Sequence, residues 1–210
     1  MNKYQIISLI ILATALASAI YFYTIFPSTI ASHWGANGEV NGTMGKFWGL
    51  FLVPIMMIGL YILFLAIPHI DPRKENIKKF RPQYDLFILI FLVFMLYIFI
   101  LTILWNLGYR FNMLQVMLPA LAILFYYMGS LLQKAKRNFF IGIRTPWTLS
   151  SDYVWNKTHA LGGRLYKISA IIALLGIIFS NLAIWFILIP IIATSAYLIV
   201  YSYLIFNKKK

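Results

Sequence analysis

The sequence has no cysteine and very little charge. Only 11% of its 210 residues are charged, and only five of those are acidic, whereas 62% are hydrophobic. Without cysteine, the chain forms neither disulfides nor thiolate metal sites. A soluble domain is about half apolar and a quarter charged, so this composition excludes an ordinary globular domain. It predicts an integral membrane protein instead.

Six long apolar runs account for most of the chain. A helix needs about 20 apolar residues to cross a bilayer, because unpaired backbone groups are not tolerated in lipid. We therefore predict an all-α integral membrane protein, a bundle of six transmembrane helices with a short interfacial amphipathic helix between the fourth and fifth spans. The predicted spans are 4–26, 47–68, 86–106, 113–132, 166–181 and 182–206, the last two joined by a tight turn near Ser180 and Asn181.

The basic residues are distributed unevenly between the two sides of this bundle. All but Lys46 and Arg110 of the 18 lysines and arginines fall on one side, including the C-terminal Lys208, Lys209 and Lys210. Because basic connections stay in the cytoplasm, we predict a multi-pass protein of the cell membrane with both termini cytoplasmic. Most of the net charge of +13 is therefore explained by topology, basic residues near anionic lipid head groups add attraction, and no direct contact with nucleic acid is needed.

The N-terminal span carries a second pattern. Its basic start, apolar middle and the small residues 15–19 resemble a signal-peptide cleavage site. However, the apolar run continues to Phe26, which is long enough for a complete span. We favour an uncleaved first span, and cleavage would leave five.

The external loop, residues 27–46, contains two turn dipeptides. Asn37-Gly38 and Asn41-Gly42 tolerate positive φ, which predicts that the loop folds back tightly. The loop is either a compact outer cap or a recognition surface, and Trp34 suits the interfacial aromatic belt in both cases. The candidate recognition residues are His33, Trp34, Gly38, Gly42 and Lys46.

The longest polar segment, residues 134–165, follows the fourth span. Thr145-Pro146 is expected to break any arriving helix, and Ser150 or Ser151 can cap a new one. That helix would end or kink at Gly162-Gly163 and lie at the inner interface, with tryptophans fixing its depth. A segment this elaborate also suggests a surface for a partner.

The stretch N-F-F-I-G-I-R-T-P-W-T-L-S-S-D-Y-V-W-N-K-T-H-A-L-G-G, residues 138–163, closely resembles the characteristic segment of the SdpI/YfhL membrane-protein family. The stretches P-S-T-I-A-S-H-W-G-A-N-G-E-V-N-G and P-H-I-D-P-R-K-E-N resemble the N-terminal domain that precedes it in longer SdpI-type proteins. The resemblance implies a two-span N-terminal region, residues 1–83, and a four-span SdpI-like region, residues 84–210.

The resemblance also implies a function. Such a protein is not an enzyme; it gives a bacterial producer immunity to its own secreted peptide toxin, and it holds a cytoplasmic repressor at the membrane after sensing that toxin. The cytoplasmic loop positions that match are Asp71, Pro72 and Asn76. The positions that would engage a partner or stabilise the fold are Asn138, Gly142, Arg144, Thr145, Pro146, Trp147, Ser151, Trp155, Thr158, His159 and Gly163.

Two other function classes stay open on the residues alone. A small transporter or flippase could use the proline-kinked spans, although charged residues are missing from the span centres, where proton and ion pathways usually place them. An intramembrane enzyme acting on lipid could use His69, Asp71 or His159 as its base. We predict no cofactor and no metal, since His33 lies outside in this topology whereas the other two histidines lie inside.

Overall fold

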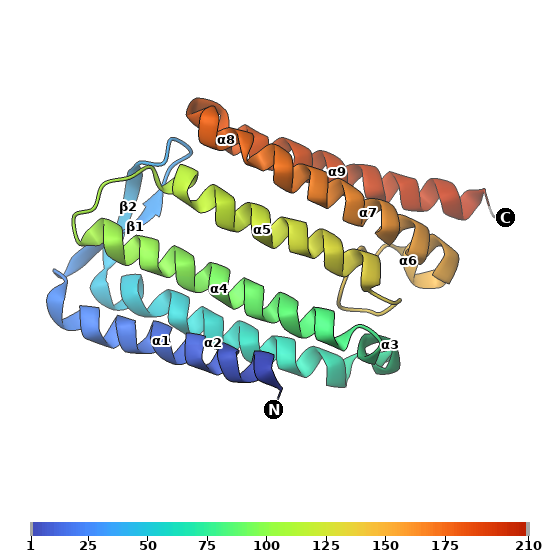
Figure 1. Cartoon of the computed structure of the whole chain (residues 1–210), viewed down its shortest axis with the longest axis horizontal. Helices are drawn as coiled ribbons and strands as arrows, with labels where there is room; N and C mark the ends of the chain where they lie inside the picture. Colours follow the sequence, from blue (N-terminus) through green and yellow to red (C-terminus); the bar gives the residue numbers. More distant parts are fainter. Residues whose placement is uncertain (1, 209–210) are drawn as a thin grey trace.

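Within residues 2–208, six long helices run side by side (Figure 1). The computed structural model describes residues 2–208, so Lys209 and Lys210 of the predicted cytoplasmic tail lie outside the described residues. Five of the helices coincide with predicted apolar runs, and each of the six is long and apolar enough to cross a membrane. The fifth span was predicted at 166–181, but it begins at Asp152 and extends to Ile178, because the polar turns before residue 166 belong to the same helix. The long helices are α1 (Lys3–Ile25), α2 (Lys46–Ile70), α4 (Arg81–Asn106), α5 (Met113–Lys134), α7 (Asp152–Ala173) and α9 (Ala183–Asn207).

Shorter elements connect these helices at the two ends of the bundle. A hairpin lies at one end, and α3 and α6 lie at the other end together with both chain ends (Figure 1). The tight turn expected before the last span is confirmed, since a short helix and a 3-10 turn occupy it. The short elements are β1 (Thr29–Trp34), β2 (Val40–Gly45), α3 (Lys74–Lys78), α6 (Pro146–Ser150), α8 (Leu175–Ile178) and η1 (Ser180–Leu182).

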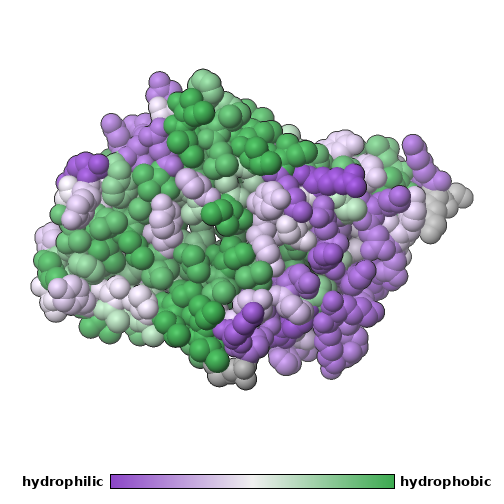
Figure 2. Space-filling model, in the orientation of Figure 1, coloured by the Kyte–Doolittle hydropathy of each residue, from purple (hydrophilic) through white to green (hydrophobic). Residues whose placement is uncertain are grey.

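Hydrophilic residues gather at the end that carries α3 and α6, while hydrophobic residues cover most of the remaining visible surface (Figure 2). This segregation is the one that the distribution of lysine and arginine predicts. We refer to the two ends as the basic end and the hairpin end. The cytoplasmic orientation of the basic end stays a prediction.

Glycines bring α7 close to both of its neighbours, α5 and α9. A Cβ on Gly163 would lie 2.5 Å from the carbonyl oxygen of Gly129 in α5, and one on Gly162 would lie 3.1 Å from Leu198 in α9. Small residues at such points let helix backbones approach in a membrane bundle. The Gly-Gly pair therefore allows α7 to pack between two helices.

The predicted interfacial helix is wrong as a separate element. Residues 152–161 are the first turns of α7, which continues without a break through Gly162 and Gly163 to Ala173. The prediction failed because contacts with α5 and α9 compensate for the low helix propensity of glycine. Ser151 does cap this helix, since its side chain accepts from the Val154 N–H, but the capped helix is part of the fifth span.

The loop of residues 27–46, which was predicted to be external, contains an antiparallel hairpin, and only one of its two predicted turns is present. Gly38 adopts a φ of +79°, as the Asn37-Gly38 dipeptide predicts. Asn41 and Gly42 instead lie within β2, where Gly42 pairs with His33. A Cβ on Gly42 would lie 3.0 Å from the His33 Cβ, so this glycine permits close approach of the strands.

Candidate functional site

The predicted partner-binding residues lie at the basic end, in the loop before α6, in α6 itself and in the first turns of α7. We call this region, residues 135–163, the basic cap. Its loop crosses the end of the bundle without regular secondary structure until α6 begins at Pro146. Side-chain hydrogen bonds therefore have to satisfy much of its backbone.

Asn138 organises the loop of the basic cap around its own side chain. It is fully buried, and its Nδ2 donates to the carbonyls of Lys136 and Ile141 at 2.8 and 2.9 Å. Its Oδ1 accepts from the N–H groups of Phe140 and Ile141 at 2.9 and 2.6 Å. A buried amide with four such bonds has no polar atom left for a partner, so Asn138 is a structural residue.

His159 holds the same loop from the α7 side. Its Nε2 accepts from the Ile143 N–H at 2.9 Å, and its Nδ1 lies 2.8 Å from the Trp155 carbonyl, so the ring carries its proton on Nδ1. Gly142 has a φ of +115°, and a Cβ there would collide with His159 Nε2. With both nitrogens engaged and only 2% of the residue exposed, His159 is not available as a catalytic base.

Trp155 is not the membrane anchor that the sequence predicted. It is fully buried, its ring stacks on His159 at 3.9 Å, and its Nε1 donates to the Ala135 carbonyl at 2.9 Å. The loop folds over the indole and supplies the acceptor that a buried N–H requires. Trp147 is partly exposed and packs against Tyr203 of α9, with ring centroids 5.1 Å apart.

Thr145 and Pro146 begin α6, a short helix that was not predicted; the pair was expected to break a helix arriving from the fourth span, but α5 already ends at Lys134. The Thr145 side chain accepts from the Thr148 N–H at 3.2 Å, and Pro146 occupies the first helical turn. Thr145 Oγ1 also lies 3.0 Å from Ser202 Oγ, which joins α6 to α9. Thr158 is buried in α7, and its hydroxyl has no hydrogen-bond partner among residues 2–208.

Asp71 joins the connection between α2 and α4 to the basic cap. It is 2% exposed, and its carboxylate accepts from the N–H groups of Arg73 at 2.6 Å and Phe139 at 2.8 Å. Close by, Asn76 Nδ2 donates to the Arg137 carbonyl at 2.8 Å. Pro72 follows Asp71 in the turn and is exposed. The structure thus places together two segments that the sequence analysis treated separately.

The remaining charges of the basic end are partly paired. Arg137 forms an ion pair with Asp152 at 2.7 Å, and the exposed Arg144 donates to the Phe139 carbonyl at 2.9 Å. The hydrogen bond from Lys78, 2.6 Å long, lowers the pKa of the Glu75 carboxyl.

The matched positions of the basic cap divide into a buried set and a smaller surface set. Asn138, Thr145, Trp155, Thr158, His159 and Gly163 are buried. Arg144 and Pro146 are exposed, and Gly142, Trp147 and Ser151 are partly exposed. A partner could touch only the second set unless the cap opens. Sequence reasoning missed the exposed Phe139 and Phe140, which lie within the motif but looked like ordinary apolar residues.

At the hairpin end, two asparagines of the long helices bind the hairpin. The Asn106 amide exchanges two hydrogen bonds with the backbone of Ala31, 2.8 and 3.0 Å long, and thereby acts as a partner for β1. Asn112 Nδ2 donates to the Asn37 carbonyl at 2.7 Å, and the Met113 N–H donates to the Gly38 carbonyl. The sequence analysis did not identify either asparagine. Asn112 could have been noticed as the N-cap of α5, whereas nothing in the sequence around Asn106 indicates a contact with the hairpin except its position at the end of a span.

The predicted recognition residues of the loop occupy different surroundings. His33 is exposed and hydrogen-bonds Asn41 across the hairpin. Trp34 packs edge-on against Trp105, with ring centroids 6.0 Å apart. The Arg110 guanidinium lies over the Trp105 ring, 4.0 Å from its centroid. Lys46 begins α2 and donates to the Tyr23 carbonyl at 3.1 Å. The predicted residues therefore form no single cluster.

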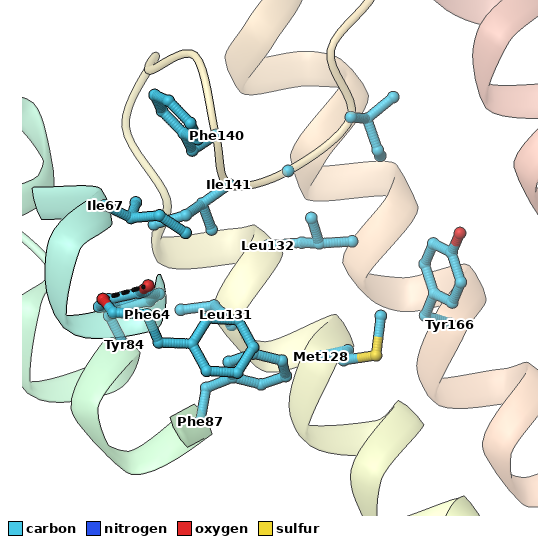
Figure 3. Close-up of a pocket in the computed structure, with 12 residues that line it drawn as sticks. Phe64, Ile67, Tyr84, Phe87, Met128, Leu131, Leu132, Phe140, Ile141 and Tyr166 are labelled. Carbon is cyan, nitrogen blue, oxygen red and sulfur yellow. Dashed lines mark hydrogen bonds between the residues drawn. The ribbon is translucent and has the colours of Figure 1, made fainter. Parts of the chain in front are cut away.

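Two cavities lie next to these structures. One, of about 360 Å³, lies between the hairpin tip and the loop that joins α4 to α5, where Glu39, Trp105 and Arg110 contribute to its wall. The other, of about 240 Å³, lies beneath residues 140–143 of the basic cap. Figure 3 shows apolar side chains that point into this second cavity from α2, α4, α5 and the loop.

Comparisons with known proteins match one segment in each half of the chain. Residues 134–203 match the model of the SdpI/YfhL protein family, and residues 9–58 match a domain of unknown function (DUF1648). The chain is 28% identical over 153 residues to the immunity protein SdpI of Bacillus subtilis (strain 168), an alignment that covers 73% of this chain and 71% of that protein. No solved structure gives a significant match.

Proposed function

We propose that this chain, whose residues 134–203 match the SdpI/YfhL family model, is a membrane immunity protein directed against a membrane-active peptide. The observation that carries the proposal is the 28% identity to an immunity protein over 73% of the chain. This alignment is longer than either matched domain alone. It therefore favours a role that is shared beyond a single matched domain.

In this proposal the hairpin end meets the peptide outside the cell. The orientation rests on the basic end, because lysine and arginine keep connections in the cytoplasm. The hairpin is held rigidly by Asn106 and Asn112, which favours recognition because little conformational entropy would be lost on binding. The adjoining cavity offers an aromatic ring from Trp105, a carboxylate from Glu39 and a guanidinium from Arg110.

The finer part of the proposal concerns the cytoplasm, where the basic cap would hold a regulatory protein at the membrane. Its exposed residues Phe139, Phe140 and Arg144 offer an apolar and cationic surface, which suits a partner that combines apolar and acidic side chains. The buried residues of the cap would then act by keeping this surface in place.

A survival assay tests the immunity proposal. The chain is expressed in a host that is sensitive to membrane-active peptides, and survival is compared with that of cells carrying an empty vector. We expect protection, and we expect Arg110→Ala to reduce it at unchanged membrane abundance. Lys208→Ala, a cation at the opposite end, serves as the matched control and should protect fully.

Three results would contradict parts of this proposal. If expression gives no protection against any peptide of a panel and recruits no cytoplasmic protein to the membrane, the immunity proposal is wrong. If the chain instead moves lipid or solute across liposome membranes, the transporter or flippase interpretation replaces it. A C-terminal tag that is accessible from outside intact cells would reverse the assignment of the two ends.

A further inference from the structure

The cavity at the hairpin end has walls from two distant parts of the chain. The hairpin tip, residues 37–40, forms one wall, and Trp105 of α4 together with residues 110–112 forms the other. Its volume of about 360 Å³ falls within the range of small ligand sites. Asn112 Nδ2 donates to the Asn37 carbonyl at 2.7 Å and so holds the two walls together. A hydrogen bond of the chain itself therefore fixes the shape of the cavity.

Arg110 presents a positive charge on one wall. Its Nη1 donates to the Trp105 carbonyl at 2.6 Å, and its guanidinium lies over the Trp105 ring, 4.0 Å from the centroid. These contacts orient the guanidinium, and a group with five N–H donors keeps others for a ligand. Within residues 2–208, Arg110 forms no ion pair, so its charge is available.

Glu39 presents a negative charge on the other wall. Its carboxylate accepts from Asn37 Nδ2 at 2.9 Å, and its N–H donates to Asn37 Oδ1 at 3.2 Å, which fixes it at the hairpin tip. Glu39 is exposed, and it too forms no ion pair in the described part of the chain. Glu39 and Arg110 are thus opposite charges that border one cavity without pairing with each other.

These two charges restrict what a ligand can be. A ligand with one charge is attracted by one wall and repelled by the other, so it gains little from the site. An uncharged apolar ligand would remove both side chains from water without giving either a partner. A ligand that carries one carboxylate and one cation complements both Arg110 and Glu39. The cavity therefore selects a ligand with both charges.

The lining of the cavity also includes apolar side chains. Val40 and Phe111 line it and are partly exposed. The head group of a zwitterionic phospholipid has the two charges but no apolar group to place against these side chains. A peptide can present an apolar side chain between an acidic and a basic one. The lining thus favours a peptide over a lipid head group.

We propose that this cavity binds a peptide segment in which an acidic and a basic side chain flank an apolar one. The carboxylate lies at Arg110, the cation lies at Glu39 and the apolar side chain packs against Phe111. This inference rests on the proposed immunity function for the role of the peptide, whereas the requirement for both charges rests on the cavity. It names the part of a membrane-active peptide that the protein recognises.

Four capped tripeptides provide the test, with the full-length protein in a mild detergent. They are acetyl-Glu-Leu-Lys-amide, its single replacements acetyl-Gln-Leu-Lys-amide and acetyl-Glu-Leu-Gln-amide, and the uncharged acetyl-Gln-Leu-Gln-amide. Binding is measured by saturation-transfer nuclear magnetic resonance, which suits weak ligands. An exposed ion pair contributes up to about fivefold in affinity, so each single replacement should weaken binding by about two- to fivefold.

Variants of the chain assign each charge of the peptide to its partner. Arg110→Gln should abolish the preference for Glu over Gln and keep the preference for Lys, because only the carboxylate loses its partner. Glu39→Gln should do the reverse. Lys208→Gln, at the opposite end, is the matched control and should change neither preference. If a variant does not fold, the four tripeptides still decide the charge requirement on the unmodified chain.

Several results would overturn the proposal. Equal binding of the four tripeptides would remove the charge requirement, and a charge preference that persists in both variants would place the site elsewhere. Displacement of acetyl-Glu-Leu-Lys-amide by dihexanoyl phosphatidylethanolamine, with no loss of binding when the leucine of the peptide is replaced by glycine, would assign the cavity to a lipid head group.

The survival assay separates this inference from the proposed function. Protection without any charge preference among the tripeptides would contradict only the inference about the cavity. The expected charge preferences without protection would contradict only the immunity function.

Discussion

Replacing Gly142 with alanine tests whether His159 holds the loop of the basic cap. Gly142 has a φ of +115°, where any residue with a Cβ is strained by about 1–2 kcal/mol. In addition, the new methyl group would collide with His159 Nε2 and separate it from the Ile143 N–H. An unsatisfied buried donor costs about 1–3 kcal/mol, so Gly142→Ala should destabilise the protein by about 2–5 kcal/mol in total.

Two other glycines isolate the parts of this effect. Gly108 also has a positive φ, +105°, but a Cβ there would meet nothing within 4 Å, so Gly108→Ala measures the backbone strain alone. Gly59 lies inside α2 with open space around it, and Gly59→Ala should be neutral or stabilise by up to about 1 kcal/mol. The expected order of stability is therefore Gly59→Ala, then Gly108→Ala, then Gly142→Ala.

The measurement is thermal or denaturant unfolding in detergent, combined with hydrogen exchange at the Ile143 amide. Gly142→Ala should increase exchange at that amide, whereas Gly108→Ala should leave it protected. If Gly142→Ala is no less stable than Gly108→Ala and the Ile143 amide stays protected, the His159 contact does not hold the loop, and the structural role given to this histidine is wrong.

Three further substitutions test the other contacts at the two ends. Trp155→Phe should lower the free energy of unfolding, measured in detergent, by about 2–4 kcal/mol, because it leaves a void and removes the donor to the buried Ala135 carbonyl. Trp147 is partly exposed, so Trp147→Phe should lower it by less than about 1 kcal/mol. Asp71→Asn should cost about 1–3 kcal/mol and expose the Phe139 amide to exchange, whereas Asp152→Asn, which is 69% exposed, should change stability by less than about 1 kcal/mol. Asn106→Leu should free β1, so that limited proteolysis cuts the hairpin faster, and Thr43→Val on the exposed side of β2 should not; equal cleavage of the two variants would contradict the docking role of Asn106.

Several features of the site were within reach of sequence reasoning. Thr145 and Pro146 begin a helix because a cap followed by proline is a local signal. Ser151 caps the next helix for the same reason, and Gly38 occupies the turn that its dipeptide predicts. These outcomes depend on residues that are neighbours in the chain.

The wrong predictions involve contacts between distant residues. Gly162 and Gly163 look like a helix end until Gly129 and Leu198 are placed beside them. Trp155 resembles an interfacial residue until the Ala135 carbonyl is found at its indole nitrogen. In both cases the local sequence suggests one role, and contacts with residues distant in the sequence give the residue another.

The sequence by itself determined that the protein spans a membrane six times and that its cations gather at one end. Both properties follow from composition and length, because lipid requires about 20 apolar residues per helix and disfavours charge. Only the tertiary structure decided that Asp71, Asn138 and His159 hold one loop across that end. Their bonds join residues up to 68 positions apart, and the distance between such residues depends on how the helices pack, which no local pattern encodes.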